Sequence, residues 1–221
     1  MRWALATAAI VIVVLLLELV AQLVLPGIAA DNVRDQLQKS GRVENVQVDA
    51  FPALKLIFHK ADTVTVKMAS YTSSTSRLTN LLEESNDVGT LHASAGTFTD
   101  GLLTLHDATL TKHGDTLTGT AQVDEKDLTH AIPLIKSVTP IASTGGTLTL
   151  RGTAELPIVG DITVPFVVEV QNGALIAAPD IPVVGGLATL QLFKNAHLTI
   201  TRVSAKKSAG GFTVSATGTL H

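Results

Sequence analysis

The longest apolar run in the chain lies at its N-terminus and limits what the first residues can form. Residues 3–25 are interrupted only by Thr7, Glu18 and Gln22. Twenty-three helical residues rise about 1.5 Å each and reach roughly 35 Å, whereas the hydrocarbon core of a bilayer is about 30 Å thick. The run is therefore long enough to cross a membrane, and a buried helix of a soluble core is the weaker interpretation.

A cleaved signal peptide is the alternative to an uncleaved membrane anchor. Arg2 gives a short positive start, and the small residues of Ile28–Ala30 are typical of a cleavage site. Glu18 would lie about 10 Å from the polar end of a spanning helix, where a carboxylate costs less than at the bilayer centre. Both interpretations stay open for residues 1–25, and both predict that residues 26–221 form a single extracytoplasmic domain.

Charge and composition exclude several classes of function. The chain has 16 basic and 19 acidic side chains and no cysteine. Without a positive field, nucleic acid is a poor partner. Without cysteine, a disulfide framework, a thiolate nucleophile and a cysteine zinc site are excluded. The 221-residue sequence is too apolar for disorder and is long enough for a sizeable core.

Beyond residue 40, polar and apolar residues alternate with a period of two, which is typical of strands with one dry face. The clearest segments are 46–50, 64–68, 103–106, 148–151 and 198–201. Turn sequences between strand-like runs predict antiparallel hairpins at Asp100-Gly101, His113-Gly114-Asp115, Asn172-Gly173 and Gly210-Gly211.

Helical spacing occurs at residues 26–40, 74–85 and 124–137. Pro26 suits the start of the first helix, and Pro133 should kink or shorten the last. The pattern predicts an α+β chain that is mainly β, with a long antiparallel sheet packed against helices.

One group of polar residues could carry chemistry. His106, Asp107, His113 and Asp115 lie around one predicted hairpin and suggest metal ligands or an acid–base pair. Strand alternation, however, places His106 and Asp107 on opposite faces, so a solvated turn is the favoured interpretation. Hydrolase and nucleotide-binding motifs are also missing from the sequence. We therefore expect a non-enzymatic protein with no metal and no cofactor.

The segment 46–56, followed by 61–66, resembles the actinobacterial LmeA-like phospholipid-binding family. In that family a short helix leads to a strand, a Gly-Phe-Pro-like corner, an apolar stretch and a second strand. The corner here is Ala50-Phe51-Pro52, with alanine where glycine is usual. The resemblance implies a membrane-attached or secreted envelope protein similar to the tubular lipid-binding (TULIP) domains, whose long curved antiparallel sheet wraps around helices and encloses an apolar tunnel.

If the tunnel is present, large apolar side chains should hold acyl chains there. The candidates for lipid binding are Phe51, Leu54, Leu56, Phe58, Val64, Val66, Phe166, Val168, Leu187 and Leu190. Lys55, His59 and Lys60 are candidates for contact with an anionic head group. The alternative makes the apolar residues ordinary core, including a buried core strand over residues 50–58, and the three basic residues a solvated face.

The predicted function is phospholipid binding or lipid transfer without catalysis. The expected location is the extracytoplasmic face of the cytoplasmic membrane or a periplasm-like envelope space. The expected partners are a phospholipid or another acyl lipid and, if residues 3–25 are uncleaved, the membrane itself. One alternative is a structural or adhesive envelope protein with a packed β core and protein or cell-wall partners. Another is a hydrolase around His106 and Asp107.

Overall fold

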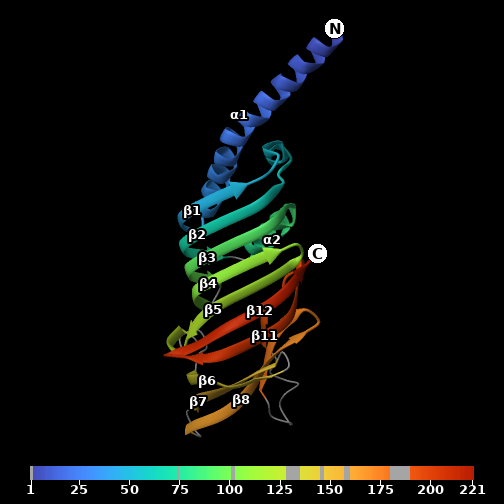
Figure 1. Cartoon of the computed structure of the whole chain (residues 1–221). Coiled ribbons are helices and arrows are strands. Elements are labelled where there is room, and N and C mark those ends of the chain that lie inside the picture. The colour runs from blue at the N-terminus through green and yellow to red at the C-terminus, as the bar shows by residue number, and fades with distance from the viewer. Residues whose placement is uncertain are drawn as a thin grey trace.

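The structure is a computed structural model and describes residues 2–73, 75–100, 103–127, 135–144, 147–156, 160–179 and 190–221. Side chains are described over a smaller set, which begins at Glu18. The molecule is elongated, with a helix at one end and a ladder of strands below it (Figure 1). It exposes 13508 Å², whereas a compact monomer of 23.1 kDa exposes about 9,700 Å². The chain is therefore far from spherical.

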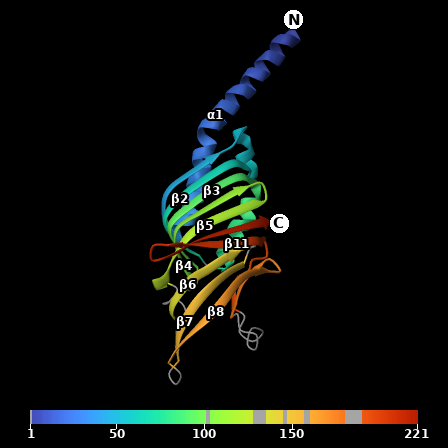
Figure 2. The same ribbon diagram turned by 60° about the horizontal axis from the view of Figure 1, so that its bottom comes forward.

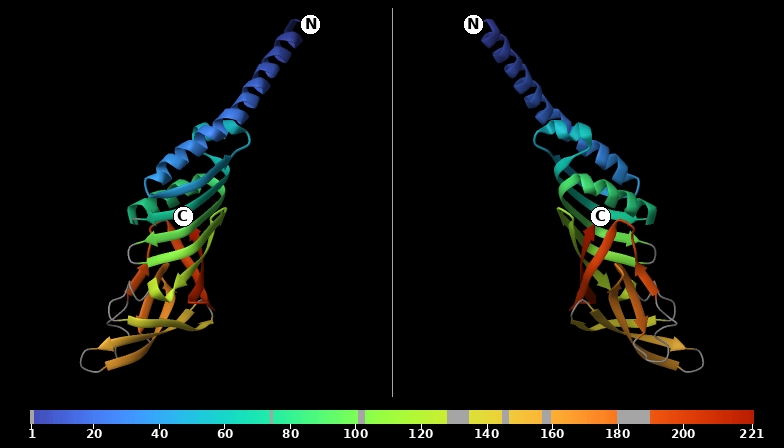
Figure 3. Two further views of the ribbon diagram at one scale, coloured as in Figure 1. Left: turned by 90° about the vertical axis from the view of Figure 1, so that its left-hand side faces the viewer. Right: turned by 90° about the vertical axis from the view of Figure 1, so that its right-hand side faces the viewer.

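The N-terminal end is a single helix, α1 (Arg2–Gln38). Its first half extends away from the rest of the molecule, and its second half packs against the first sheet (Figure 3). The expected helix start at Pro26 is wrong, because Pro26 lies inside α1. Proline removes only one backbone hydrogen bond, and good helix formers continue the helix on both sides.

Membrane crossing was a prediction for residues 3–25. In the part of the chain that the structure describes, no helix is both long and apolar enough to cross a bilayer. The side chains of residues 1–17 lie outside that description. The membrane anchor and the signal peptide therefore both stay predictions.

The described strands form two sheets, one of seven strands and one of five. The first sheet has the order β1 (Gly41–Asp49), β2 (Ala61–Ser73), β3 (Val88–Asp100), β4 (Leu103–His113), β5 (Thr116–Asp124), β12 (Gly211–Leu220) and β11 (Leu198–Ser208). The second has the order β10 (Leu190–Phe193), β9 (Ala174–Pro179), β8 (Gly160–Gln171), β7 (Thr147–Leu156) and β6 (Ile135–Thr144). The second sheet lies below β11 and β12, as Figure 2 shows from underneath.

Short helical segments connect or flank the strands. They include η1 (Ala53–Phe58), α2 (Thr75–Glu84) and η2 (Ser85–Asp87), and residues 125–127 are also helical. Of the strand pairs, β2 and β3 are parallel, and the other pairs in the described residues are antiparallel. The parallel pair needs a crossover, and α2 with η2 supplies it.

The predicted fold class is confirmed: the chain is mainly β, with a long curved sheet and helices packed against it (Figure 1). The five alternating segments lie in strands, except that Ala50 follows the end of β1. The predicted turn at Asn172-Gly173 has φ of 51° and 75° at the two residues, as a type I′ hairpin requires. The helix expected over 124–137 is wrong at its end, because β6 begins at Ile135, and residues 128–134 lie outside the described residues.

Two apolar clusters position the sheets, and a third packs Leu82 of α2 against Leu117 and Leu220 of the first sheet. In the first, Leu37 of α1 packs against strands β1 and β2, whose buried side chains are Val46, Val48, Val64, Val66, Met68 and Tyr71. In the second, the two sheets meet through Val123, Leu148, Val168, Ala205 and Phe212. The seven-stranded sheet is therefore covered at both ends of its strand order, by α1 at one end and by the second sheet at the other.

Candidate functional site

The strand register aligns apolar side chains across all seven strands of the first sheet. We call one such line the apolar row; the paired residues are Val46, Val66, Ala93, Leu110, Gly119, Ala216 and Val203. Residues next to this row along each strand point to the opposite face. That outer face carries exposed threonines such as Thr111, Thr118 and Thr120. The apolar row therefore marks one continuous inner face.

Burial along the apolar row is complete at its ends and incomplete in its middle. Val46 and Val66 are buried beneath α1, and Val203 is buried near the second sheet. Ala93, Leu110, Gly119 and Ala216 are only half-buried. Three of these four middle residues are alanine or glycine, and the fourth, Leu110, packs against the cluster that Leu82 of α2 forms with Leu117 and Leu220.

A second line of paired residues contains one charge. This lysine row consists of Val48, Val64, Leu91, Lys112, Leu117, Gly218 and Ile200. Lys112 is 2% exposed, and its Nζ donates a hydrogen bond to the backbone oxygen of Val88. Burial lowers the pKa of Lys112, and the nearby Asp115 and Asp87 partly oppose that change. The lysine therefore ties β4 to the start of β3.

The corner between β1 and β2 is held by two carboxylates. Glu18 Oε1 of α1 accepts a hydrogen bond from the backbone N–H of Ala53 at 2.9 Å, and Asp62 Oδ2 accepts one from Phe51 at 2.6 Å. The Lys55 Nζ lies 2.9 Å from the other oxygen of Asp62. The Phe51 N–H, and next the Lys55 ammonium, lower the pKa of Asp62. These contacts fix η1 against α1.

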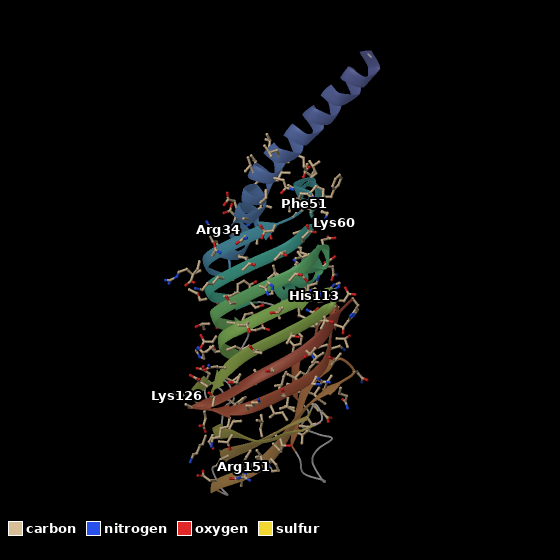
Figure 4. All side chains as sticks on the ribbon, in the orientation of Figure 1. Arg34, Phe51, Lys60, His113, Lys126 and Arg151 are labelled. Atoms are coloured by element: carbon tan, nitrogen blue, oxygen red, sulfur yellow. The ribbon has the colours of Figure 1, made fainter. Side chains whose placement is uncertain are left out.

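The side chains of this corner face solvent. Phe51 is 75% exposed and Phe58 is 72% exposed, and η1, which ends at Phe58, contacts α1. Figure 4 labels Phe51 and Lys60 there, far from Arg151 at the opposite end. We call residues 51–60 together with 19–28 of α1 the apical tip. Five of its backbone N–H groups are paired within the protein, whereas nine of its large apolar side chains are exposed.

The structure places the predicted acyl-chain residues in separate regions. Val64 and Val66 lie on the inner face, but they are covered by α1, and Leu56 packs against the same cluster. Phe51, Leu54 and Phe58 are exposed at the apical tip. The buried core strand considered for residues 50–58 is wrong, because residues 53–58 form the helix η1.

The other predicted acyl-chain residues belong to the second sheet or to undescribed positions. Val168 is buried between the sheets. The Phe166 ring, half-buried, lies over Gly152, where an added Cβ would come within 2.8 Å of it. Leu187 lies outside the described residues, and the side chain of Leu190 is likewise not described. The predicted set therefore does not form one lining, and its role in lipid binding stays a prediction.

The three predicted head-group residues do lie together. Lys55 is in η1, His59 ends it in a left-handed conformation with φ of 59°, and Lys60 follows. The carboxylate of Asp62 partly neutralises Lys55. In the described part of the chain, no carboxylate pairs with His59 or Lys60. These two residues are exposed at the edge of the apical tip.

The polar group suspected around the β4–β5 hairpin is arranged differently from the prediction. His113 and Asp115 lie exposed at the turn. His106 Nε2 instead lies 2.7 Å from Asp127 Oδ2 and 4.0 Å from Asp124 Oδ2, within reach of a shared cation. Asp107 is exposed, with a φ of 48° at a β-bulge, and takes no part in this group. The His106–Asp127 contact is itself a complete ion pair when the histidine is protonated.

Sequence reasoning missed two residues that organise the site. Lys112 could have been found, because it follows Ala108 and Leu110 with a period of two and must share their face. The partner of Glu18 could not, since Ala53 is 35 positions away in sequence. The change of apolar phase between Leu105 and Ala108 was also a readable sign of the bulge at Asp107.

Comparison with known proteins gives little guidance. No family model and no curated protein matches the chain. A solved structure of a STAR-related lipid transfer protein from Xanthomonas axonopodis matches with a TM-score of 0.20 and 11% identity. The match covers 51% of this chain and 75% of that one. Lipid transfer is a property of that protein, and a TM-score this low does not establish a shared fold. The resemblance to the LmeA-like family stays a prediction.

Proposed function

We propose that this chain is a non-enzymatic lipid-binding protein of the cell envelope, which holds the acyl chains of a phospholipid along the inner face of its seven-stranded sheet. The single observation that supports this proposal is the state of the apolar row. The row is apolar across seven strands, is buried at both ends, and is only half-buried at Ala93, Leu110, Gly119 and Ala216, where Leu82 of α2 packs beside Leu110.

Hydrocarbon is the ligand that this surface favours. Each methylene moved from water to an apolar surface is stabilised by about 0.8 kcal/mol. Moving the same chain from a bilayer changes the free energy little, so loading and release need no energy source. A ligand with many polar groups would leave them unpaired here, since the residues of the apolar row offer no side-chain donor or acceptor. Acyl chains have no polar groups and therefore avoid this cost.

Photocrosslinking would test the proposal with the full chain in place. The protein is reconstituted in phosphatidylcholine nanodiscs that contain a phospholipid with a diazirine at the end of one acyl chain. After irradiation, adducts are mapped by proteolysis and mass spectrometry. We expect adducts on β3, β4, β5 and β12, at inner-face residues such as Leu91 and Leu110. Adducts confined to α1 would refute the proposal, because α1 alone would then meet lipid.

The alternative is a structural or adhesive envelope protein whose inner face is ordinary core. Organic extraction of the purified protein separates the two functions. Stoichiometric phospholipid in the extract supports lipid binding. A lipid-free extract, together with no uptake of a fluorescent phospholipid, supports the structural alternative.

A further inference from the structure

Exposed apolar side chains are concentrated at one end of the molecule. Eleven large apolar side chains are exposed among the described residues, and nine of them belong to the apical tip. They are Leu19, Val20, Leu23, Val24, Ile28, Phe51, Leu54, Ile57 and Phe58. Soluble surfaces rarely gather so many uncovered apolar groups, and such patches mark contact with a protein or a membrane.

Five backbone N–H groups between Phe51 and Lys60 are paired within the protein. Pro52 has no N–H, and the N–H groups of Phe51 and Ala53 donate to Asp62 and Glu18. Those of Lys55, His59 and Lys60 donate to backbone oxygens of the same corner. A loop that enters the apolar part of a bilayer must pair its polar groups internally, because lipid tails offer no partners. An ordinary surface loop has no such need.

The position of the tip favours a bilayer as its occupant. The tip includes residues 19–28 of α1, and the part of α1 before them extends beyond the tip from the same end of the molecule (Figure 3). Residues 3–17 of that part carry no charge. A second copy docked on the tip would leave this apolar run in water, whereas a bilayer would cover both. Lys60 and His59, at the edge of the tip, could extend toward the phosphate level.

We propose that the apical tip is a membrane-docking surface, in which Phe51, Leu54, Ile57 and Phe58 enter the interfacial layer of the bilayer beside α1. This inference rests on the proposed lipid-binding function and adds an orientation to it. The strands of the first sheet then succeed one another away from the membrane, from β1 to β11.

Single-cysteine labelling can test the docking, because the native chain has no cysteine. A cysteine is placed at Phe58 (F58C) or, as the control, at exposed Arg151 (R151C) at the far end (Figure 4). Each full-chain variant is labelled with the fluorophore NBD and placed in phosphatidylcholine nanodiscs, one protomer per disc. We expect blue-shifted emission at position 58 and strong quenching by nitroxide-labelled lipid, with neither at position 151. Equal, unquenched, water-like emission at both positions would overturn the docking.

A second variant removes the effect of the label on the apolar surface. The label is moved to the edge of the apical tip by Lys60→Cys. This substitution is made in the native background and in a Phe51→Ser/Phe58→Ser background. If the phenylalanines hold the tip at the bilayer, the double substitution should reduce lipid quenching at position 60 about tenfold. Unchanged quenching would contradict their role. Circular dichroism confirms that each variant is folded.

The outcomes separate docking from lipid binding and from self-association. Lipid photoadducts on the inner face with an unquenched tip would leave the proposed function intact and refute the docking. A quenched tip without inner-face adducts would do the reverse. A blue shift seen only when two protomers share a disc would show that a second copy covers the tip, and would also overturn the proposal.

Discussion

Filling the centre of the inner face should exclude lipid without unfolding the protein. Gly119 is the position for this test, because it lies in the middle of the apolar row and is half-buried. A Cβ built there would meet Leu110 Cδ1 at 3.5 Å and the backbone oxygen of Thr109 at 3.6 Å, which are ordinary contacts. Gly119→Leu therefore adds a side chain that projects into whatever occupies the inner face.

The magnitude follows from the carbons that the leucine displaces. If it takes the place of about four methylenes of an acyl chain, lipid binding weakens by about 3 kcal/mol, or roughly two orders of magnitude in Kd. The free energy of unfolding should not fall, because replacing a glycine within a strand stabilises the folded state by about 0.5–1 kcal/mol. If protein already fills the face, overpacking instead costs about 1–3 kcal/mol and lowers Tm by at least roughly 2 °C.

The assay combines two measurements on the full chain in nanodiscs. Photoadduct yield on the inner face reports lipid occupancy, and thermal unfolding by circular dichroism reports stability. Thr118→Leu is the matched control, since Thr118 is the neighbouring residue on the exposed outer face. A lower Tm with unchanged adduct yield in Gly119→Leu would refute the reasoning, because the inner face would then be solid core.

Three further predictions concern the residues that hold the site together. Lys112→Met should flatten the pH dependence of unfolding: the folded pKa is lowered, so the unfolded state binds more protons and wild-type stability rises with pH until the ordinary value of 10.5 is passed. Denaturant titrations across this range measure the slope, and equal slopes in both proteins would contradict the expectation. Glu18→Ala should cost about 1–3 kcal/mol locally and speed hydrogen exchange at the Ala53 amide, with exchange in β12 unchanged as the control. His59→Gly should raise stability by up to about 1 kcal/mol in chemical unfolding, since φ there is 59°; a loss of stability would show that the imidazole makes a needed contact.

Local patterns were sufficient to predict the strands and hairpins. The alternation of Val46, Val48 and Ala50, or of Leu198 and Ile200, depends only on the two-residue repeat of a strand. This repeat can be read directly from the order of residues. The turn at Asn172-Gly173 likewise depends on residues that tolerate positive φ. The mainly β class therefore followed from the order of residues alone.

The candidate site was only partly accessible to the same reasoning. Lys55, His59 and Lys60 were correctly grouped because they are close in sequence. Phe51, Leu54 and Phe58 were grouped with Val64 and Val66, yet they lie outside the sheet at the apical tip. The cause is the corner held by Glu18 and Asp62, and hydrophobicity alone does not reveal whether an apolar residue is covered.

The amino-acid order by itself determined which residues pair locally: the strands, the type I′ turn, the apolar helix and the absence of cysteine chemistry. Tertiary structure alone decided that β2 and β3 run parallel, that Lys112 pairs with Leu91 and Leu117, and that Glu18 reaches Ala53. The physical reason is that periodicity is a property of neighbouring residues, whereas register and burial depend on contacts between segments far apart in the chain.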